Sequence, residues 1–410
     1  MKRFSRRLLL ALVITIPPGS ALAGATSDEY EPRLLRATAN IVAGQWSVGL
    51  KVLNALTQDY PDSRVGHLLR SDLLLALAGR VGSLPDLSDL SDRSSEARAQ
   101  ELREQLRLRW QHAIGSREVK ANRVPAKLVK VSLENTAVLY VDLPAARLHV
   151  FRQIHGELQR LADFYVTVGR QGYGKEREGD LKTPVGVYRI NGYIPGSQLD
   201  ARYGSGALTT NYPNPLDQQL RRTGYGIWLH GTEPGWINRA PRASEGCITL
   251  SNADFGNLYR LLGTADELPI IIDDTPDWIF PAELQRLRAN LLAIVHGGPQ
   301  LTSQQQVEPS SAAITVDLTK ISRHDLPEAR AKAGGLEFTE IFIYPGPKTQ
   351  LVTRATKFKG SGKTDIVEQY WVKEDNGQWR IALQQQIPVM TQRKIASEPE
   401  PTSAKQESGA

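Results

Sequence analysis

The chain has 410 residues, a length that predicts two to three domains of roughly 150 residues each. Hydrophobic residues make up 40% and charged residues 23%, which is the balance of a folded protein with a sizeable core and excludes a wholly disordered chain. The formal net charge of +6 suggests nucleic-acid binding, but four of the basic residues lie in residues 1–23, and without them the net charge is +2 (6 − 4). We therefore expect no nucleic-acid partner.

Residues 1–23 have the features of an export signal. A basic start is followed by an apolar run at residues 8–16 and by small residues at Ala21 and Ala23, which suit signal peptidase. The run is too short to span a bilayer, which takes about 20 residues, so an uncleaved anchor is the weaker alternative. Residues 5–9 resemble part of a twin-arginine signal, which leaves Sec and Tat export both open. We expect a periplasmic protein with no stable membrane insertion once the signal is removed.

The next region, residues 24–125, is predicted to be an α-helical module. Apolar residues recur at helical spacing between residues 30 and 79, and a charged amphipathic helix is expected over residues 96–114. The stretch around Trp46 resembles one tetratricopeptide hairpin, whereas a solenoid needs about three such repeats. We expect this module to pack or dock rather than to perform chemistry.

From residue 138 the apolar period changes from 3.6 to 2, which predicts β-strands. Seven short strands are expected, at residues 138–142, 147–151, 164–168, 185–190, 226–230, 247–250 and 269–272. Many short strands with Gly and Pro turns indicate a mainly β sandwich or barrel. The polar segment 193–225 has the length of a lid or a binding loop.

The C-terminal part is predicted to contain a connecting helix and a second β-rich region. The helix is expected within residues 276–300, and the β-rich region covers residues 301–393, with Asn376-Gly377 as a hairpin turn. Residues 394–410 are polar and are predicted to be a disordered tail.

Cys247 is the single cysteine of the chain, so no internal disulfide is possible. A lone thiol in an oxidising compartment is either a packing residue or kept for its chemistry. The glycine spacings at residues 169–174 and 357–364 do not fit nucleotide-binding loops, and the seven scattered histidines show no metal-ligand spacing. We expect no cofactor and no metal.

His230 ends one predicted strand and Cys247 begins another, 17 positions later. Antiparallel neighbours joined in this way can place the imidazole beside the thiol, which needs a base because its ordinary pKa of about 8.5 leaves little thiolate at neutral pH. Gly246 tolerates unusual backbone angles, so the amides of Gly246 and Cys247 could point into an oxyanion pocket. We expect an accessible Cys247 whose pKa is lowered by a protonated His230. A packed cysteine and an unrelated histidine are the alternative.

The residues around this pair resemble a known family. His-Gly, a loop of this length, and then Ser-x-Gly-Cys-Ile-x-Leu at residues 230–250 resemble the active-site signature of the L,D-transpeptidase (YkuD-type) catalytic domain. Residues 179–188 resemble the upstream strand motif of that family, and the resemblance covers residues 136–273. Many members have His in place of Glu245 and Arg or Asn in place of Thr249, differences that bear on substrate preference.

The resemblance implies an exported cysteine enzyme that acts on peptidoglycan stem peptides, with cell-wall proteins as an open second class of partner. Carried over, Cys247 is the nucleophile, His230 is the acid and base, and the Gly231 carbonyl orients the imidazole. The acyl-enzyme would pass to an amine in an L,D-transpeptidase or to water in an L,D-carboxypeptidase. Because cross-linking is the commoner activity with this signature, we expect a transpeptidase first and keep hydrolysis as the alternative.

Three further residues are candidates for substrate binding. Arg239 and Arg242 precede the cysteine and could contact stem-peptide carboxylates, together with Ser244, although solvated loop charges explain both arginines equally well. Residues 301–393 resemble the α+β NTF2-like domain of cell-shape L,D-carboxypeptidases. After the transpeptidase and the carboxypeptidase, the third alternative for the function is a wall-binding scaffold without catalytic activity.

Overall fold

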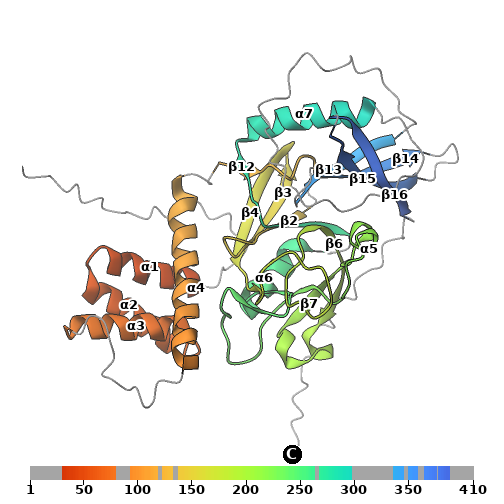
Figure 1. The fold of residues 1–410 in the computed structure, drawn as a ribbon. Helices are drawn as coiled ribbons and strands as arrows, with labels where there is room; N and C mark the ends of the chain where they lie inside the picture. Colours follow the sequence, from red (N-terminus) through yellow and green to blue (C-terminus); the bar gives the residue numbers. More distant parts are fainter. Residues whose placement is uncertain are drawn as a thin grey trace, which may run out of the picture.

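The computed structural model describes residues 30–79, 93–118, 122–132, 137–263, 267–297, 336–345, 350–358, 364–375 and 377–387. Figure 1 shows three units in chain order: a group of helices, a central β unit and a smaller C-terminal sheet. The predicted signal peptide and C-terminal tail lie outside the described residues. Among the helices that are described, none combines the length and the apolar character needed to cross a membrane.

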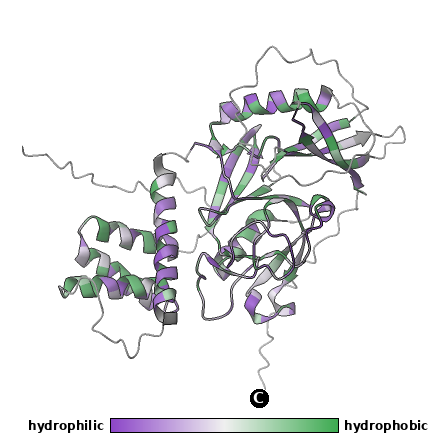
Figure 2. Cartoon of the chain, in the orientation of Figure 1, coloured by the Kyte–Doolittle hydropathy of each residue, from purple (hydrophilic) through white to green (hydrophobic). Residues whose placement is uncertain are grey.

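Four helices make up the N-terminal unit and confirm the predicted helical module. They are α1 (Tyr30–Val42), α2 (Trp46–Asp59), α3 (Arg64–Leu77) and α4 (Arg93–Glu118). The first three enclose a small apolar core that includes Leu34, Leu53 and Leu56. Helix α4 is largely hydrophilic, and it lies between α1–α3 and the central unit (Figures 1 and 2). Arg109 of α4 contacts both sides, since it pairs with Glu31 of α1 and stacks on Tyr165 of the central unit.

The central unit is an eight-stranded mixed sheet in the order β10-β8-β7-β6-β11-β2-β3-β4. Its strands are β2 (Ala137–Asp142), β3 (Arg147–Ile154), β4 (Glu157–Tyr165), β6 (Gly186–Pro195), β7 (Gly206–Thr210), β8 (Trp228–His230), β10 (Ile248–Thr249) and β11 (Leu268–Asp273). Strand β11 is parallel to β2 and antiparallel to β6, so the sheet mixes both pairings. Two small ladders join β1 (Val124–Pro125) to β12 (Trp278–Ile279) and β5 (Val168–Gly169) to β9 (Arg242–Ser244).

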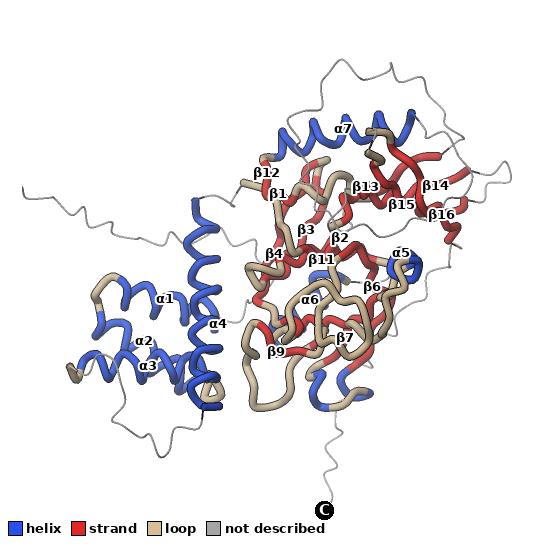
Figure 3. The backbone as a smooth tube through the Cα atoms, in the orientation of Figure 1, coloured by secondary structure: helices blue, strands red, loops and turns tan. Residues whose placement is uncertain are grey.

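This sheet is a single curled layer (Figure 3) and not the predicted two-sheet sandwich, although its mainly β character is confirmed. The reason is α6 (Asn252–Leu262), a helix that the strand pattern did not reveal. Its side chains Phe255 and Leu258 are buried in the same core as Leu139 and Ile270 of the sheet. A helix therefore supplies the apolar layer that a second sheet supplies in a sandwich.

The segment 193–225, predicted to be a loop, contains regular structure. It holds the end of β6, the short helices η1 (Gly196–Gln198) and η2 (Ala201–Tyr203), strand β7, and α5 (Pro215–Gln219). Asn214 caps α5 by accepting a hydrogen bond from the Asp217 amide. The polar composition of the segment hid these elements because they are short.

The C-terminal unit begins with α7 (Pro281–Gly297) and continues as a four-stranded antiparallel sheet. Its strands are β13 (Leu336–Tyr344), β14 (Gln350–Phe358), β15 (Thr364–Lys373) and β16 (Trp379–Ile387). Phe338 and Phe342 share one apolar core with Leu291 of α7 and with Val138 and Tyr140 of the central sheet. A C-terminal β unit is thus present, but the NTF2-like α+β assignment is not confirmed, and residues 301–335 of that prediction lie outside the described residues.

Candidate active site

The two residues predicted to do chemistry lie on neighbouring strands. His230 is the last residue of β8, and Cys247 directly precedes β10. The strands are parallel, with Thr249 opposite His230, so the expectation of antiparallel neighbours is wrong. The loop 231–246 is long enough for the crossover that parallel strands require. Since residues two apart in an extended chain face the same side, this register directs the Cys247 thiol and the His230 imidazole to one face of the sheet.

The His230 ring is held in one tautomer. Its Nδ1 atom lies 2.6 Å from the carbonyl oxygen of Gly231, and because a carbonyl can only accept, Nδ1 carries the proton of the neutral ring. Nε2 is then an acceptor, and the Thr249 hydroxyl lies 3.3 Å from it. Burial lowers the pKa of His230 to about 4, with Arg239 adding to the effect and the Gly231 hydrogen bond opposing it. The imidazole is therefore neutral at pH 7.

Cys247 is half-buried, and its Sγ donates to the Gly226 carbonyl at 3.2 Å. Burial raises the pKa of this thiol above its ordinary value. The predicted lowered pKa is therefore wrong: it assumed a protonated His230, whereas the buried ring is neutral and supplies no positive field. The resting pair is a neutral thiol and a neutral imidazole.

A tight turn delivers Cys247 to the end of its strand. Gly246 has φ +128°, and a Cβ at this position would lie 2.7 Å from the Lys182 carbonyl oxygen, so a larger residue does not fit. The Gly246 amide donates to Ser244 Oγ at 3.1 Å, and Ser244 Oγ donates to the Cys247 carbonyl at 2.6 Å. Both bonds are internal to the turn, so the buried Ser244 shapes the turn and occupies the amide that was expected to face an oxyanion.

Thr183 was not among the predicted site residues, yet it connects the turn to a second segment. Its hydroxyl donates to the Gly246 carbonyl at 3.0 Å and accepts from the Gly169 amide at 2.8 Å. The side chain is fully buried. The motif at residues 179–188 contains this threonine, so that motif was the sequence signal for it.

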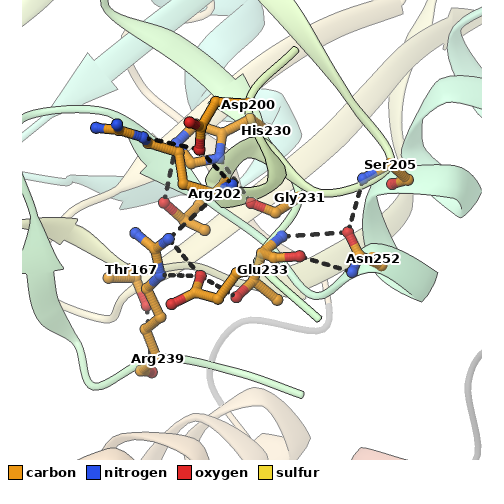
Figure 4. A network of polar contacts seen from close by, with 11 residues as sticks. Thr167, Asp200, Arg202, Ser205, His230, Gly231, Glu233, Arg239 and Asn252 are labelled. Atoms are coloured by element: carbon orange, nitrogen blue, oxygen red, sulfur yellow. Dashed lines mark hydrogen bonds and ion pairs between the residues drawn. The ribbon is translucent and has the colours of Figure 1, made fainter. Parts of the chain in front are cut away.

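Arg239 and Arg242, the predicted substrate-binding arginines, have different surroundings. Arg239 pairs with Glu233 at 2.5 Å and donates to the Arg202 carbonyl at 3.2 Å (Figure 4), so its charge is already compensated within the site. Arg242 is exposed in β9, and its guanidinium lies 5.4 Å from the centre of the Tyr173 ring. Of the two, Arg242 is the one that solvent reaches readily.

Asn252 fixes the beginning of the loop 231–246, and sequence reasoning did not single it out. Its Oδ1 accepts from the amides of Ser205 and Thr232, and its Nδ2 donates to the Thr232 carbonyl (Figure 4). The ring of Tyr203 meets the His230 imidazole edge-on, with the ring centres 5.0 Å apart. These side chains come from α6 and η2, which only the tertiary fold brings to β8.

Glu245, beside the nucleophile candidate, is exposed and forms an ion pair with Arg170 at 2.7 Å. In the part of the chain that the structure describes, no three His, Cys, Asp or Glu side chains are grouped as metal ligands.

Residues 136–272 match the family model of the YkuD L,D-transpeptidase catalytic domain. No curated protein matches the chain. Among solved structures, Bd1075 of Bdellovibrio bacteriovorus is similar at 20% identity and TM-score 0.48, covering 66% of this chain and 100% of that one. The helical cell shape determining protein Pgp2 of Campylobacter jejuni is similar at 19% identity and TM-score 0.44, covering 63% and 95%. An L,D-transpeptidase of Xylanimonas cellulosilytica follows at 15% identity and TM-score 0.22, covering 35% and 63%. The unit that carries His230 and Cys247 is thus the part of the chain that matches the YkuD L,D-transpeptidase catalytic domain.

Proposed function

We propose that this protein is an exported L,D-transpeptidase that remodels peptidoglycan stem peptides in the periplasm through an acyl-enzyme on Cys247. The observation that carries the proposal is the Nδ1 hydrogen bond of His230 to the Gly231 carbonyl, inside a domain that matches the family model. This bond leaves Nε2 as an unprotonated base on the side of the sheet to which the register directs the thiol. The apolar leader at residues 8–16 supports export.

The first half-reaction begins from a neutral pair. Cys247 Sγ attacks the carbonyl carbon of the L-centre while its proton passes to His230 Nε2, and the Gly231 carbonyl stabilises the imidazolium that forms. The Thr249 hydroxyl, which lies 3.3 Å from Nε2 at rest, rotates away as the thiol proton arrives. We assign the stabilisation of the oxyanion to the Cys247 amide, since the Gly246 amide is engaged with Ser244. The imidazolium then protonates the departing amine of the D-residue, and a thioester remains.

In the second half-reaction an acceptor amine attacks the thioester carbonyl. His230 Nε2 removes a proton from that amine, the carbon–sulfur bond breaks, and the proton returns to the Cys247 sulfur. The exposed Arg242 is the side chain that we assign to a stem-peptide carboxylate, since Arg239 is already paired with Glu233.

Hydrolysis is the second candidate function, and one observation favours it. Glu245 would attract an acceptor ammonium group, but its carboxylate is already paired with Arg170. If no other group recruits an amine, water takes the acyl group and the enzyme is an L,D-carboxypeptidase.

The deciding experiment incubates the purified protein with disaccharide-tetrapeptide and an excess of a D-amino acid, with product masses as the readout. Cross-linked dimers, or exchange of the terminal D-residue, support the transpeptidase, and tripeptide alone supports the carboxypeptidase. Cys247→Ala should abolish every product. Products that persist in this variant would place the nucleophile elsewhere, and a wild-type protein that leaves stem peptides intact would contradict both candidates.

The pH profile tests the role of His230. The base works only when Nε2 is unprotonated, and the pKa of His230 is about 4, so kcat/KM should hold at pH 6 and fall as the pH drops through about 4. An acidic limb near pH 6.5, the ordinary value for histidine, would show that a different or more exposed base is at work.

The neutral resting pair also predicts a slow thiol. Because burial raises the pKa of Cys247, iodoacetamide should alkylate it more slowly at pH 7 than it alkylates free cysteine, with the rate rising above pH 9. Rapid alkylation at neutral pH would instead indicate a resting thiolate–imidazolium pair.

A further inference from the structure

The loop 231–246, which connects His230 to Cys247, contacts the helical module through two adjacent residues. Arg64, the first residue of α3, stacks on the indole of Trp236, with the guanidinium carbon 3.4 Å from the ring centre. Ile237, the next residue of the loop, packs against the apolar core of α1–α3. The catalytic loop therefore has both a cation–π and an apolar contact with a unit that carries no predicted chemistry.

A second connection reaches the same loop through the sheet. The guanidinium carbon of Arg109, on α4, lies 3.9 Å from the centre of the Tyr165 ring at the end of β4. The Tyr165 hydroxyl donates to the Arg239 carbonyl at 3.1 Å, and the Thr167 hydroxyl donates to the same oxygen at 3.2 Å. The backbone of the loop at Arg239 is thus held by a tyrosine that α4 covers.

A third connection is electrostatic and concerns the exposed arginine of the loop. The pKa of Glu104 on α4 is lowered first by its hydrogen bond with Arg107, and Arg242 contributes a further lowering. The charge of Arg242 is therefore felt at Glu104 of the module.

From the loop, contacts continue to the base. The Arg239 side chain pairs with Glu233 and donates to the Arg202 carbonyl (Figure 4). Arg202 is followed by Tyr203, whose ring meets the His230 imidazole edge-on. These contacts reach the base only at second hand, through the backbone of Arg202, whereas Arg242 belongs to the loop itself.

We propose that the helical module positions the loop 231–246, with Arg64 and Ile237 as positioning residues that hold Arg242 where it captures the stem peptide. This inference rests on the proposed function for its kinetic part, but its structural part does not. Detaching the loop should weaken substrate capture more than it alters the Cys247–His230 chemistry, because neither Arg64 nor Ile237 contacts the reacting groups.

The test compares four variants of the full chain: Arg64→Ala, Arg64→Lys, the double variant Arg64→Ala/Ile237→Ala, and the control Arg70→Ala. Arg70 lies on the same helix and hydrogen-bonds Asn54 within the module. Amide hydrogen exchange of residues 232–246 is measured first, because it needs no activity. Arg64→Ala should speed exchange in this loop by roughly twofold to fivefold, the loss expected for one exposed cation–π contact. Arg64→Lys should keep much of the wild-type protection, because a lysine can also stack on the indole. The double variant should exchange faster than Arg64→Ala. Arg70→Ala should leave the loop at the wild-type rate.

Steady-state kinetics on disaccharide-tetrapeptide and iodoacetamide labelling give the second readout. Arg64→Ala should raise KM by roughly the same factor, while kcat and the alkylation rate of Cys247 stay within twofold of wild type. Unchanged exchange in the loop would overturn the proposal, and so would faster exchange with an unchanged KM. Equal losses in kcat and alkylation rate would mean general damage to the site and would also overturn it. If the wild-type protein turns over no stem peptide, the proposed function fails while the exchange result still judges the contact between module and loop.

Discussion

Two units attach to the central domain, and they do so with different proportions of apolar and charged contacts. The C-terminal sheet shares with it an apolar core that contains Phe338, Phe342, Val138 and Tyr140, and one buried ion pair, between Glu340 of β13 and Arg189 of β6, also joins the two. The helical module attaches mainly through charged and aromatic side chains. Glu31 of α1 pairs with Arg147 of β3 at 2.8 Å and with Arg109 of α4 at 2.7 Å.

The charged interface continues beyond Glu31. Arg147 also pairs with Asp163, and His112 of α4 lies 3.0 Å from the same carboxylate. Both Arg109 and Arg147 are buried. An apolar core gains free energy from burial whatever its exact geometry, whereas buried ion pairs stabilise only when every charge has its partner. The comparison predicts that the C-terminal sheet is part of the folding unit, and that the helical module can be released from the domain by removal of one charge.

The largest expected effect on the free energy of unfolding comes from removing an apolar side chain at the C-terminal interface. Phe342→Ala leaves a cavity in the shared core and should lower the free energy of unfolding by about 3–5 kcal/mol. In urea, fluorescence and far-UV circular dichroism should report one transition, because both sheets lose the same core. Ile343→Ala, at the half-buried neighbouring position, serves as control with a cost of roughly 1 kcal/mol. Two separate transitions in Phe342→Ala would show that the sheets fold independently.

Removing one charge at the helical interface should have a smaller and more local effect. Glu31→Gln leaves Arg109 and Arg147 short of a carboxylate and should cost about 3 kcal/mol. Faster hydrogen exchange should appear in α1 and α4, while β2 and β11 keep wild-type protection. Asp72→Asn breaks an exposed pair with Arg103 inside the module and should change stability by less than about 1 kcal/mol. A global loss of protection in Glu31→Gln would contradict the contrast between the two interfaces.

The smallest effect is expected from mild acid, and it should separate the interfaces without mutation. Burial raises the pKa of Glu31, but Arg147 and Arg109 outweigh this effect and bring the pKa below 4.5. Partial burial likewise raises the pKa of Asp163, and Arg147 outweighs it and holds this pKa well below 3.8. A carboxylate whose pKa is lower in the folded state than in the unfolded state stabilises the fold at pH values above its unfolded pKa. This contribution is lost as the pH falls from the unfolded pKa through the folded one. Docking of α1 and α4 should therefore be constant above pH 5 and weaken below pH 4.5, whereas the buried phenylalanines of the C-terminal interface do not titrate. Module contacts that weaken between pH 7 and pH 5, seen by hydrogen exchange, would contradict these assignments.

Much of the local structure follows from the sequence pattern. The period-2 runs predicted β2, β3 and β11 close to their observed bounds, because alternate or continuous apolar residues suit buried strands. Helix α6 was missed, although Ser251 caps it by accepting from the Asp254 amide at 2.9 Å and Phe255, Leu258 and Leu262 recur at helical spacing. Strand β7 was missed because it is short and lies in a polar, glycine-rich segment.

The direction of the strands that hold the site could not be predicted. A loop of this length permits either a parallel or an antiparallel return. In the folded domain the return is parallel, with β9 of the loop paired to β5 and α6 packed on the sheet after β10. The charged interface with the helical module was equally hidden, because Glu31, Arg109 and Arg147 are far apart in the sequence and each alone reads as a surface charge.

By itself, the sequence determined which side chains are candidates for chemistry: one thiol, one histidine at a strand end and a glycine before the thiol, types that are chemically special wherever they lie. Only the tertiary structure decided their protonation. The pKa of His230 falls to about 4 and that of Cys247 rises because burial removes water from both groups. The two groups contact Tyr203, Gly226 and Thr249, which come from different elements, so these surroundings exist only once the chain has folded.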